Sequence, residues 1–382
     1  MVAVRAAGAR AVELIDRVWA AGDAVLPLDP AIADATATAI ATDLGAQRVI
    51  DPTDTIDLGG ANSVPAGTAL VVRTSGTTGH PRGVVLSHAA LDAAVTASVE
   101  RLDASSARWL GVVPLHHIAG LLVVLRARVA GTTPVLHERF DAAGVAQETA
   151  VTHVSLVPTM LHRLLDHGAD LRRFDRILLG GAAPPAGLLE RAATAGARVT
   201  VSYGMTETAG GCVYDGRPLD GVAIAVDPDH RVLVRGDVLA DGYRTAGGIT
   251  PLCDADGWLR TNDLGHFVGD RLVVTGRSDD VVVSGGVNVS TTAVAELLER
   301  HPGVAQVAVI GVEDVEWGQR IVAFVVAVDT ASPPTAEALR AHVRARAEPA
   351  QVPCQVLIVD ALPRTALGKI DRAALGATVA SR

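Results

Sequence analysis

A run of glycine and hydroxyl residues at positions 74–83, with the sequence TSGTTGHPRG, is the first segment whose residue types suit chemistry. Backbone N–H groups, the hydroxyls of the run and the guanidinium of Arg82 are donors that can wrap a polyphosphate. The spacing G-x-x-x-x-G-K-[ST] is absent, which disfavours an ordinary P-loop nucleotidase. Taken alone, the same composition also suits an ordinary turn.

A second segment, SYGMTET at residues 202–208, follows a strand-like run and combines an aromatic ring, hydroxyls and a carboxylate. Tyr203 could stack on a purine, and Thr206 could donate a hydrogen bond to a phosphate oxygen. Glu207 offers the hard oxygen ligand that Mg²⁺ prefers. This combination of residues is typical of a nucleotide site. The alternative interpretation is that the segment is a loop with a surface glutamate.

Lysine is nearly absent from the chain. Of the 33 Lys and Arg residues, only Lys369 is a lysine, and it lies in the segment LPRTALGKIDR at residues 362–372. We expect this position to need a compact ammonium on a flexible stem rather than a planar guanidinium. The alternative is the chance survival of one lysine codon. Two other candidate segments precede it, WLRTNDLG at residues 258–265 and GRSDDVVVSGGVNV at residues 276–289.

The elements that must position these segments follow from hydrophobic periodicity. A strand-like run at 68–73 leads into the first segment, and strand-like and helix-like pieces alternate between 109 and 211. Alternation of this kind predicts an α/β fold with layered, mostly parallel sheets covered by helices. Short runs between 221 and 275 predict a small antiparallel sheet. The pattern after residue 278 predicts a separate α+β domain, so we expect domains at 1–278 and 279–382.

Composition excludes several other classes of protein. The net charge of −9 disfavours a nucleic-acid partner, and the apolar run at 321–328 is too short to span a bilayer. Charged residues interrupt the N-terminal segment, so we expect no export signal and a cytoplasmic protein. Cys212, Cys253 and Cys354 form no C-x-x-C pair, which argues against a disulfide framework or a zinc site. The sequence leaves open whether copies associate into a homo-oligomer.

The five segments, in this order over roughly residues 68–375, closely resemble the core motifs of the adenylate-forming superfamily. This superfamily comprises acyl-CoA synthetases, luciferase-like enzymes and adenylation domains. The resemblance implies a large N-terminal domain of layered sheets, helices and a small barrel-like sheet, followed by a small mobile C-terminal domain. It also implies an enzyme that uses ATP and Mg²⁺ and has coenzyme A as a co-substrate.

The resemblance also implies a role for each matching residue. The phosphates of ATP would be enclosed by Thr74, Ser75, Gly76, Thr77, Thr78, Gly79 and Arg82. The rest of the nucleotide would lie against Gly180, Gly181, Ala182, Tyr203 and Gly204. Thr206 would contact the α-phosphate, and Glu207 would bind Mg²⁺. Asp263 would accept the ribose hydroxyls with support from Arg277.

The remaining roles concern the two steps of the reaction. Lys369 would act as a catalytic residue with Thr206 and Glu207, stabilising the transition state in which a carboxylate displaces pyrophosphate and acyl-AMP forms. A thiol would then expel AMP. The C-terminal domain would swing about the hinge residue Asp279 between the two steps, bringing Ser284, Gly285 and Gly286 to the channel for coenzyme A.

The acid is indicated by the segment PLHHIAG at residues 114–120, in which His117 would face the substrate. The double histidine and the position of the phosphate loop so near residue 1 resemble compact actinobacterial o-succinylbenzoate–CoA ligases of menaquinone biosynthesis. The alternatives are a CoA ligase for another aryl or short acyl acid, a unit that loads a separate carrier, and a nucleotide-binding homologue without turnover. The sequence departs from the family pattern at two positions, with Arg82 in place of Lys and Asn262 in place of Gly, and we expect both changes to be tolerated.

Overall fold

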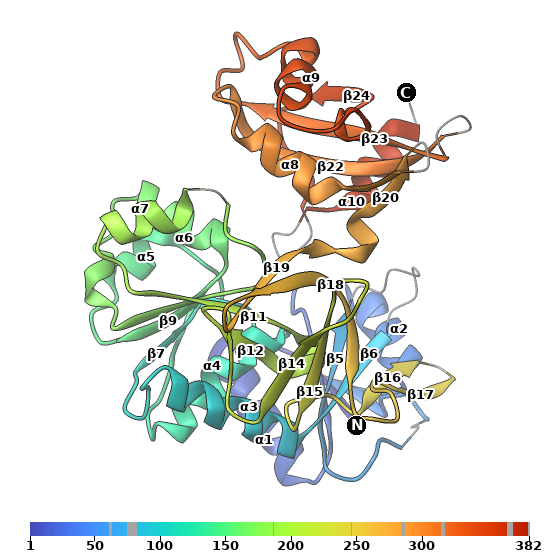
Figure 1. Cartoon of the computed structure of the whole chain (residues 1–382). Coiled ribbons are helices and arrows are strands. Elements are labelled where there is room, and N and C mark those ends of the chain that lie inside the picture. The colour runs from blue at the N-terminus through green and yellow to red at the C-terminus, as the bar shows by residue number, and fades with distance from the viewer. Residues whose placement is uncertain are drawn as a thin grey trace. The chain divides into compact units, whose positions relative to one another are not determined.

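The computed structural model describes residues 1–60, 63–74, 82–185, 187–245, 247–284, 287–314, 318–364 and 370–380. Contacts divide the chain into two units. Figure 1 shows the chain coloured from the N-terminus in blue to the C-terminus in red. Unit 1 contains residues 1–225, 233–260 and 269–271, and unit 2 contains 226–232, 261–268 and 272–382. No helix in the described ranges is long and apolar enough to cross a membrane.

The first sheet of unit 1 has the strand order β17-β16-β6-β5-β2-β1-β3-β4. Strand β2 runs parallel to β1 and β5, and β1 also runs parallel to β3, so the carboxyl ends of these four strands share one edge. The strands are β1 Val2–Arg5, β2 Val25–Leu28, β3 Arg48–Ile50, β4 Thr55–Asp57, β5 Thr68–Thr74, β6 Arg82–Ser87, β16 Gly242–Thr245 and β17 Gly248–Pro251. Helices α1 Gly8–Ala20 and α2 Asp34–Asp43 connect the first three strands.

The second sheet of unit 1 has the order β13-β12-β11-β10-β9-β7-β8, and its members from β11 to β8 are parallel. Its strands are β7 Trp109–Gly111, β8 Val135–Leu136, β9 His153–Leu156, β10 Arg176–Leu179, β11 Val199–Met205, β12 Gly210–Tyr214 and β13 Arg217–Pro218. Its helices are α3 His88–Arg101, α4 Ile118–Val129, α5 Ala142–Gln147, α6 Pro158–Asp166 and α7 Leu188–Thr194, with short helices η1 Leu171–Arg173 and η2 Thr206–Thr208. Figure 1 shows α5, α6 and α7 on one face and α3 and α4 on the other.

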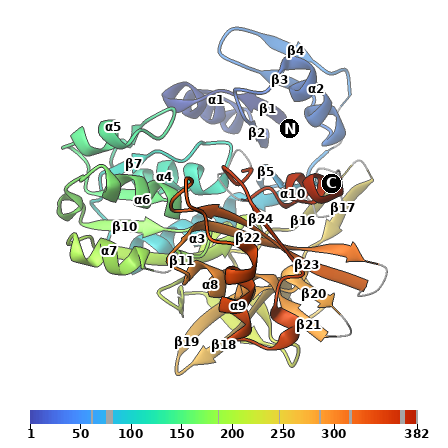
Figure 2. The ribbon, with the colours of Figure 1, turned by 90° about the horizontal axis from the view of Figure 1, so that it is seen from above.

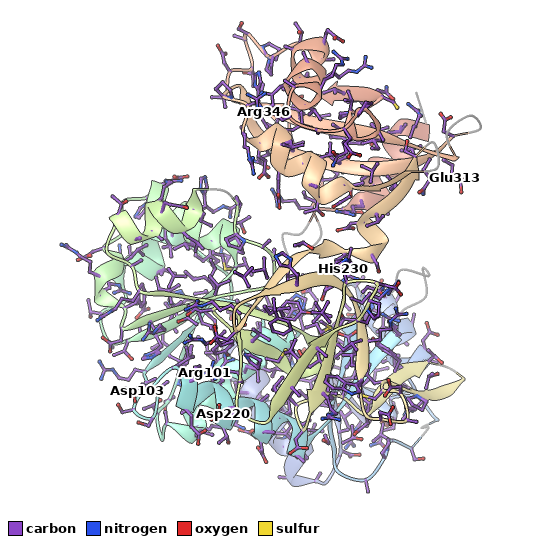
Figure 3. All side chains as sticks on the ribbon, in the orientation of Figure 1. Arg101, Asp103, Asp220, His230, Glu313 and Arg346 are labelled. Atoms are coloured by element: carbon purple, nitrogen blue, oxygen red, sulfur yellow. The ribbon has the colours of Figure 1, made fainter. Side chains whose placement is uncertain are left out.

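The end of α3 is fastened to β13 by Arg101, which lies near Asp220 in Figure 3. The guanidinium of Arg101 donates to the backbone oxygen of Pro218 at 2.7 Å and lies 3.4 Å from the Asp220 carboxylate. Asp103, just past the helix, has a φ of 52° and turns the chain away. These contacts hold the antiparallel strands that follow β11 against the helical layer.

A third sheet has the order β14-β15-β18-β19, and the division between the units passes through its strands. The strands are β14 Val222–Val226, β15 Arg231–Gly236, β18 Leu259–Val268 and β19 Arg271–Arg277.

The C-terminal part of unit 2 is a sheet of order β21-β20-β23-β22, with β24 parallel to β23. Its elements are η3 Ser278–Asp280, β20 Val281–Ser284, β21 Val287–Ser290, α8 Thr291–Glu299, β22 Val304–Asp314, β23 Gly318–Ala327, α9 Ala336–Arg344, η4 Pro349–Gln351, β24 Gln355–Ile358 and α10 Arg372–Ala380. Alternate residues of β22 and β23 pack in two separate cores, one under α8 and α9 and one under α10. Figure 2 shows these helices on opposite sides of the sheet.

The predicted α/β architecture is confirmed, and most of the expected elements occur within a few residues of their predicted positions. One difference affects the candidate site. The strand-like run expected before the segment SYGMTET continues through it to Met205, so Tyr203 and Gly204 lie on β11 itself. The extension has a physical cause, because β12 pairs antiparallel with residues 202–205 and supplies their backbone partners.

Asp51, at the end of β3, gives the fold a predicted pH dependence. Its carboxylate accepts hydrogen bonds from the backbone N–H of Thr53 at 2.8 Å and from Arg5 at 2.9 Å, which lower its pKa to about 2 from an ordinary 3.8. A lowered folded-state pKa stabilises the fold above the unfolded value, and this contribution is lost as pH falls through the folded value. We expect the difference in Tm between the wild type and Asp51→Asn to shrink from pH 4 to pH 2. Asp57→Asn, at an exposed carboxylate of β4, is the control, and a pH-independent difference for Asp51→Asn would contradict the prediction.

Candidate active site

The strands on either side of the predicted phosphate loop are joined at their ends. Thr74 ends β5, Arg82 begins β6, and the two residues are paired in the antiparallel register. The Thr74 hydroxyl and Arg82 Nε are buried, and neither has a hydrogen-bond partner among the residues that the structure describes. Because an unsatisfied buried donor is costly, these atoms suit a polar group brought to this place. Ser75, Gly76, Thr77, Thr78 and Gly79 lie outside the described residues.

The carboxyl end of β10 meets β11 at the predicted nucleotide segment. Gly180 lies directly beside Ser202, because a Cβ built on Gly180 would stand 3.5 Å from the Ser202 side chain. Gly181 has a φ of +85°, a left-handed conformation that glycine adopts without strain. Gly180 therefore lies next to Ser202, the residue that precedes Tyr203, and Gly181 and Ala182 follow it in the turn. The structure brings together these two predicted parts of the nucleotide site.

Gly204 allows the second half of the segment to form. A Cβ on Gly204 would lie 2.0 Å from the backbone oxygen of Gly210, so no other residue permits β11 and β12 to approach this closely. The turn between the strands is the short helix η2, which contains Thr206 and Glu207. The hydroxyl of Thr208 accepts from the Met205 N–H at 3.0 Å and donates to the Gly210 carbonyl at 2.6 Å. This hydroxyl fixes both ends of the turn.

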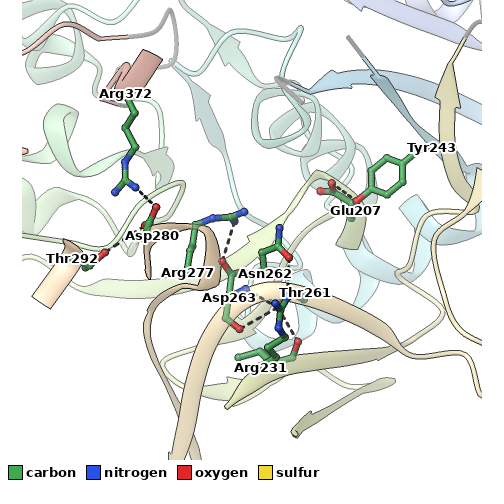
Figure 4. A network of polar contacts seen from close by, with 11 residues as sticks. Glu207, Arg231, Tyr243, Thr261, Asn262, Asp263, Arg277, Asp280, Thr292 and Arg372 are labelled. Atoms are coloured by element: carbon green, nitrogen blue, oxygen red, sulfur yellow. Dashed lines mark hydrogen bonds and ion pairs between the residues drawn. The ribbon is translucent and has the colours of Figure 1, made fainter. Parts of the chain in front are cut away.

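Glu207 is held by a residue that sequence reasoning missed. The hydroxyl of Tyr243, on β16, donates to Glu207 Oε1 at 2.8 Å, as Figure 4 shows. The backbone N–H of Ala240 donates to the Glu207 carbonyl at 2.9 Å. The guanidinium carbon of Arg82 lies 4.1 Å from the centre of the Tyr243 ring. One tyrosine thus contacts both the predicted metal ligand and the predicted phosphate-loop cation. The rarity of tyrosine could have pointed to this residue, since the chain has only 3 tyrosines.

The residues present fit Mg²⁺ bound together with a phosphate ligand. No group of three or more His, Cys, Asp or Glu side chains that could hold a metal occurs in the described ranges. Mg²⁺ does not need such a cage, because proteins usually hold it through one or two carboxylates and the phosphates of the substrate. Glu207 supplies one carboxylate of this kind, while the buried atoms of Thr74 and Arg82 lack partners within the described chain.

In unit 2, the predicted ribose residues lie together. Arg277, the last residue of β19, donates to Asp263 Oδ1 at 3.1 Å, and the Asp263 side chain is 10% exposed. The Asp263 N–H donates to the hydroxyl of Thr261 at 3.0 Å, and that hydroxyl donates to the Val232 carbonyl at 2.8 Å. This network, drawn in Figure 4, orients a carboxylate acceptor.

Asn262, which stands where the family commonly has glycine, also has a structural role in unit 2. Its side-chain oxygen accepts from Arg231 at 3.1 Å, which joins β15 to β18. Arg231 in turn donates its backbone N–H to Asp227 at 2.9 Å. Asn262 therefore makes a side-chain hydrogen bond beside Asp263 that a glycine could not make.

The neighbourhood of the predicted hinge is held by Asp280. Its carboxylate contacts the guanidinium of Arg372 and accepts from the Thr292 hydroxyl at 3.4 Å. Its carbonyl accepts from the Thr291 hydroxyl at 2.8 Å. Asp279 lies in η3, immediately before this residue, and its side chain is not described. Ser284 ends β20 and is buried, whereas Gly285, Gly286 and Lys369 lie outside the described residues.

His117 immediately precedes α4, and its ring centre lies 4.1 Å from that of His116. His116 Nε2 is 4.0 Å from Asp29 Oδ2, at the carboxyl end of β2. Burial lowers the pKa of His116, and the nearby Asp29 charge opposes this shift. Because β2 lies next to β5 and runs parallel to it, Asp29 lies at the same sheet edge as Thr74, where the predicted phosphate loop begins. Asp29 was not predicted from the sequence. It could have been identified because ligands of α/β proteins bind at the carboxyl ends of parallel strands, and Asp29 follows such a strand.

Comparison with protein families matches two parts of the chain. The family described as AMP-binding enzyme matches residues 61–243, and the AMP-binding enzyme C-terminal domain matches residues 293–369. The first range contains Thr74, Glu207 and Tyr243, and the second ends at Lys369.

Among curated proteins, the chain is similar to a probable 2-succinylbenzoate–CoA ligase of Mycobacterium tuberculosis strain H37Rv. The two are 42% identical over 321 residues, which cover 80% of this chain and 83% of the relative. Among solved structures, o-succinylbenzoate CoA synthetase from Bacillus subtilis with its acyl-adenylate intermediate matches with a TM-score of 0.84 and 27% identity, covering 98% of this chain and 87% of the other. The same B. subtilis enzyme with ATP and magnesium ion matches with a TM-score of 0.83 and 28% identity, covering 98% and 88%.

Proposed function

This chain belongs to the AMP-binding enzyme family, and on that premise we propose that it is an ATP-dependent ligase that converts 2-succinylbenzoate to its CoA thioester. The observation that carries the proposal is the end of β11, where Glu207 is anchored by Tyr243 beside Arg82. A carboxylate and a cation held at the end of a phosphate loop suit the binding of a magnesium nucleotide. The choice of acid rests on the similarity to 2-succinylbenzoate–CoA ligases.

The first step joins two anions. The carboxylate oxygen of the acid attacks the α-phosphorus of ATP, the bond to the β-phosphate oxygen breaks, and pyrophosphate leaves with that electron pair. Arg82 would offset the charge of the leaving phosphates, and Lys369 would offset the charge at the reacting centre. Thr206 would donate to an α-phosphate oxygen. Mg²⁺, held by Glu207, would supply further positive charge at the phosphates when bound.

The nucleoside end of ATP would be held by separate groups. Tyr203, on β11 beside the turn of residues 180–182, would stack on adenine. Asp263 would accept the ribose hydroxyls, because an ionised carboxylate oriented by Arg277 accepts but does not donate. Each of these contacts would help to orient the nucleotide for in-line attack on the α-phosphorus.

The second step replaces AMP by sulfur. The thiol of coenzyme A attacks the acyl carbon, its proton goes to solvent or base, and AMP leaves with the electrons of the mixed anhydride bond. We propose that the part of the chain after Asp279 moves between the steps, removing Lys369 and bringing residues 284–286 to the thiol channel. A domain boundary at 278/279 and a location in the cytoplasm remain predictions.

The acid would lie against His117. The ring of His116 lies beside that of His117, and His116 Nε2 is near the Asp29 carboxylate. Asp29 would thereby help to hold both imidazoles at the sheet edge where β5 ends. A ligase for another aryl or short acyl acid would use the same reaction residues, so the acid must be tested directly.

Measuring pyrophosphate release with a panel of acids tests the proposal. We expect 2-succinylbenzoate to exceed benzoate and acetate by at least about a hundredfold in kcat/KM, since a site that binds a substrate's polar groups rejects analogues that lack them. CoA should then convert the adenylate to thioester with release of AMP. Equal rates for the three acids would refute the assignment of the acid. No turnover with any acid, in protein that still binds ATP, would support the nucleotide-binding homologue without turnover.

A further inference from the structure

Tyr243 is the residue through which two charged groups of the candidate site are connected. Its hydroxyl donates to Glu207 Oε1 at 2.8 Å, and its ring face contacts the guanidinium of Arg82 at 4.1 Å. The hydrogen bond from a phenol to a carboxylate is charge-assisted, and the contact of a guanidinium with an aromatic face is a cation–π interaction. The same ring therefore has a carboxylate at its edge and a cation on its face.

The backbone leaves this ring little freedom to move. In the antiparallel register of β16 and β6, Tyr243 is opposite Val84, two residues beyond Arg82. Gly242 and Arg244, its neighbours, are both buried, and the Arg244 guanidinium donates to the backbone oxygens of Leu44 and Ser63. Strand pairing therefore helps to set the position of Tyr243, in addition to the contacts of its side chain with Glu207 and Arg82.

The two contacts of Tyr243 affect what the charges of Arg82 and Glu207 can do. Arg82 and Glu207 have opposite charge, and a direct ion pair between them would neutralise both. The guanidinium of Arg82 lies on the face of the Tyr243 ring, and its buried Nε has no hydrogen-bond partner among the described residues. The Glu207 carboxylate has one oxygen oriented by a neutral donor, the Tyr243 hydroxyl. Arg82 and Glu207 are thereby left available to bind a ligand.

We infer that Tyr243 is a positioning residue that holds Glu207 for Mg²⁺ and Arg82 for the phosphates of ATP while preventing the two from pairing with each other. The inference rests on the proposed function only for the identity of the nucleotide. It concerns the step that uses the triphosphate and metal, and it assigns Tyr243 no part in the transfer of the acyl group to sulfur.

Two variants separate the two contacts of the ring. Tyr243→Phe removes the hydroxyl and keeps the aromatic face, so Glu207 loses its donor while Arg82 keeps its contact. Tyr243→Leu removes both. Tyr214→Phe is a control, because it also removes a hydrogen-bonded phenol hydroxyl from unit 1, one that lies 2.7 Å from the Ser98 hydroxyl and accepts from Arg126 at 3.3 Å.

The experiment is calorimetric titration of ATP at a series of Mg²⁺ concentrations, with no acid present. We expect Tyr243→Phe to raise the Mg²⁺ concentration for half-maximal ATP binding about tenfold, the scale of one hydrogen bond to a charged group. Tyr243→Leu should also weaken ATP binding at saturating Mg²⁺. Both variants should convert supplied acyl-adenylate and CoA to thioester within about twofold of the wild type, since that step uses neither triphosphate nor metal. Tyr214→Phe should keep the Mg²⁺ dependence of the wild type.

Three results would overturn the inference: an unchanged Mg²⁺ dependence in Tyr243→Phe, a shift as large in Tyr214→Phe, or a parallel loss of the thioester step that marks general damage to the fold. Failure of the proposed function looks different. Wild-type protein that binds ATP with Mg²⁺ but ligates no acid would refute the ligase assignment and leave the inference about Tyr243 standing on its binding data.

Discussion

We expect Lys369→Ala to lower the rate of adenylate formation by about a thousandfold, the scale that applies when one preorganised donor is removed from a developing anionic centre. The acid and the triphosphate are both anions, and Lys369 is the only lysine that can offer a compact ammonium to them. The measurement is pyrophosphate release from ATP and 2-succinylbenzoate. Thioester formation from supplied acyl-adenylate and CoA persists, because the lysine is expected to have left the site in that step.

Lys369→Arg is the companion variant, since it keeps the charge and changes the shape from a point to a planar fork. We expect it to recover only part of the adenylation rate. Because no other lysine is present, an amine-selective reagent labels this side chain and the N-terminus alone, and ATP with acid should protect it. Equal losses in both half-reactions would contradict movement of the C-terminal part between them.

Glu207→Gln has the second largest expected effect. The amide has the shape of the carboxylate and can still accept from Tyr243, so the η2 turn should form while the charge is lost. We expect adenylation to fall by about a hundredfold and added Mg²⁺ not to restore it fully, because a neutral amide is a poor ligand for a hard cation. The thioester step from supplied acyl-adenylate should change little.

Glu190→Gln is the matched control for this variant. Glu190 is an exposed carboxylate in the first turn of α7, and its replacement makes the same chemical change away from the predicted metal ligand. Its adenylation rate should equal that of the wild type. If Glu207→Gln kept the wild-type rate and Mg²⁺ dependence, Glu207 would not be the metal ligand.

Much of the α/β fold could be predicted because its signals are local. Alternating apolar runs indicated the parallel strands, and β22 and β23 read as strands because both of their faces are buried under helices. The continuous segments around Thr74, Glu207 and Asp263 could also be recognised, since each places its chemical groups within a few residues. Where the strand β11 ended could not be predicted, because its last residues are strand only through pairing with β12.

The order of the elements, the family resemblance and the candidate residues could be inferred from the sequence, because all of them depend on neighbours along the chain. The distant residues that support them could be identified only in the folded chain. Tyr243 is 36 residues from Glu207, and Arg372 is 92 residues from Asp280, and spacing carries no signal for such pairs. Asp29 meets His116 only because β2 lies beside β5. The physical reason is that strand pairing is set by the burial of whole sheet faces, which one segment of sequence does not encode.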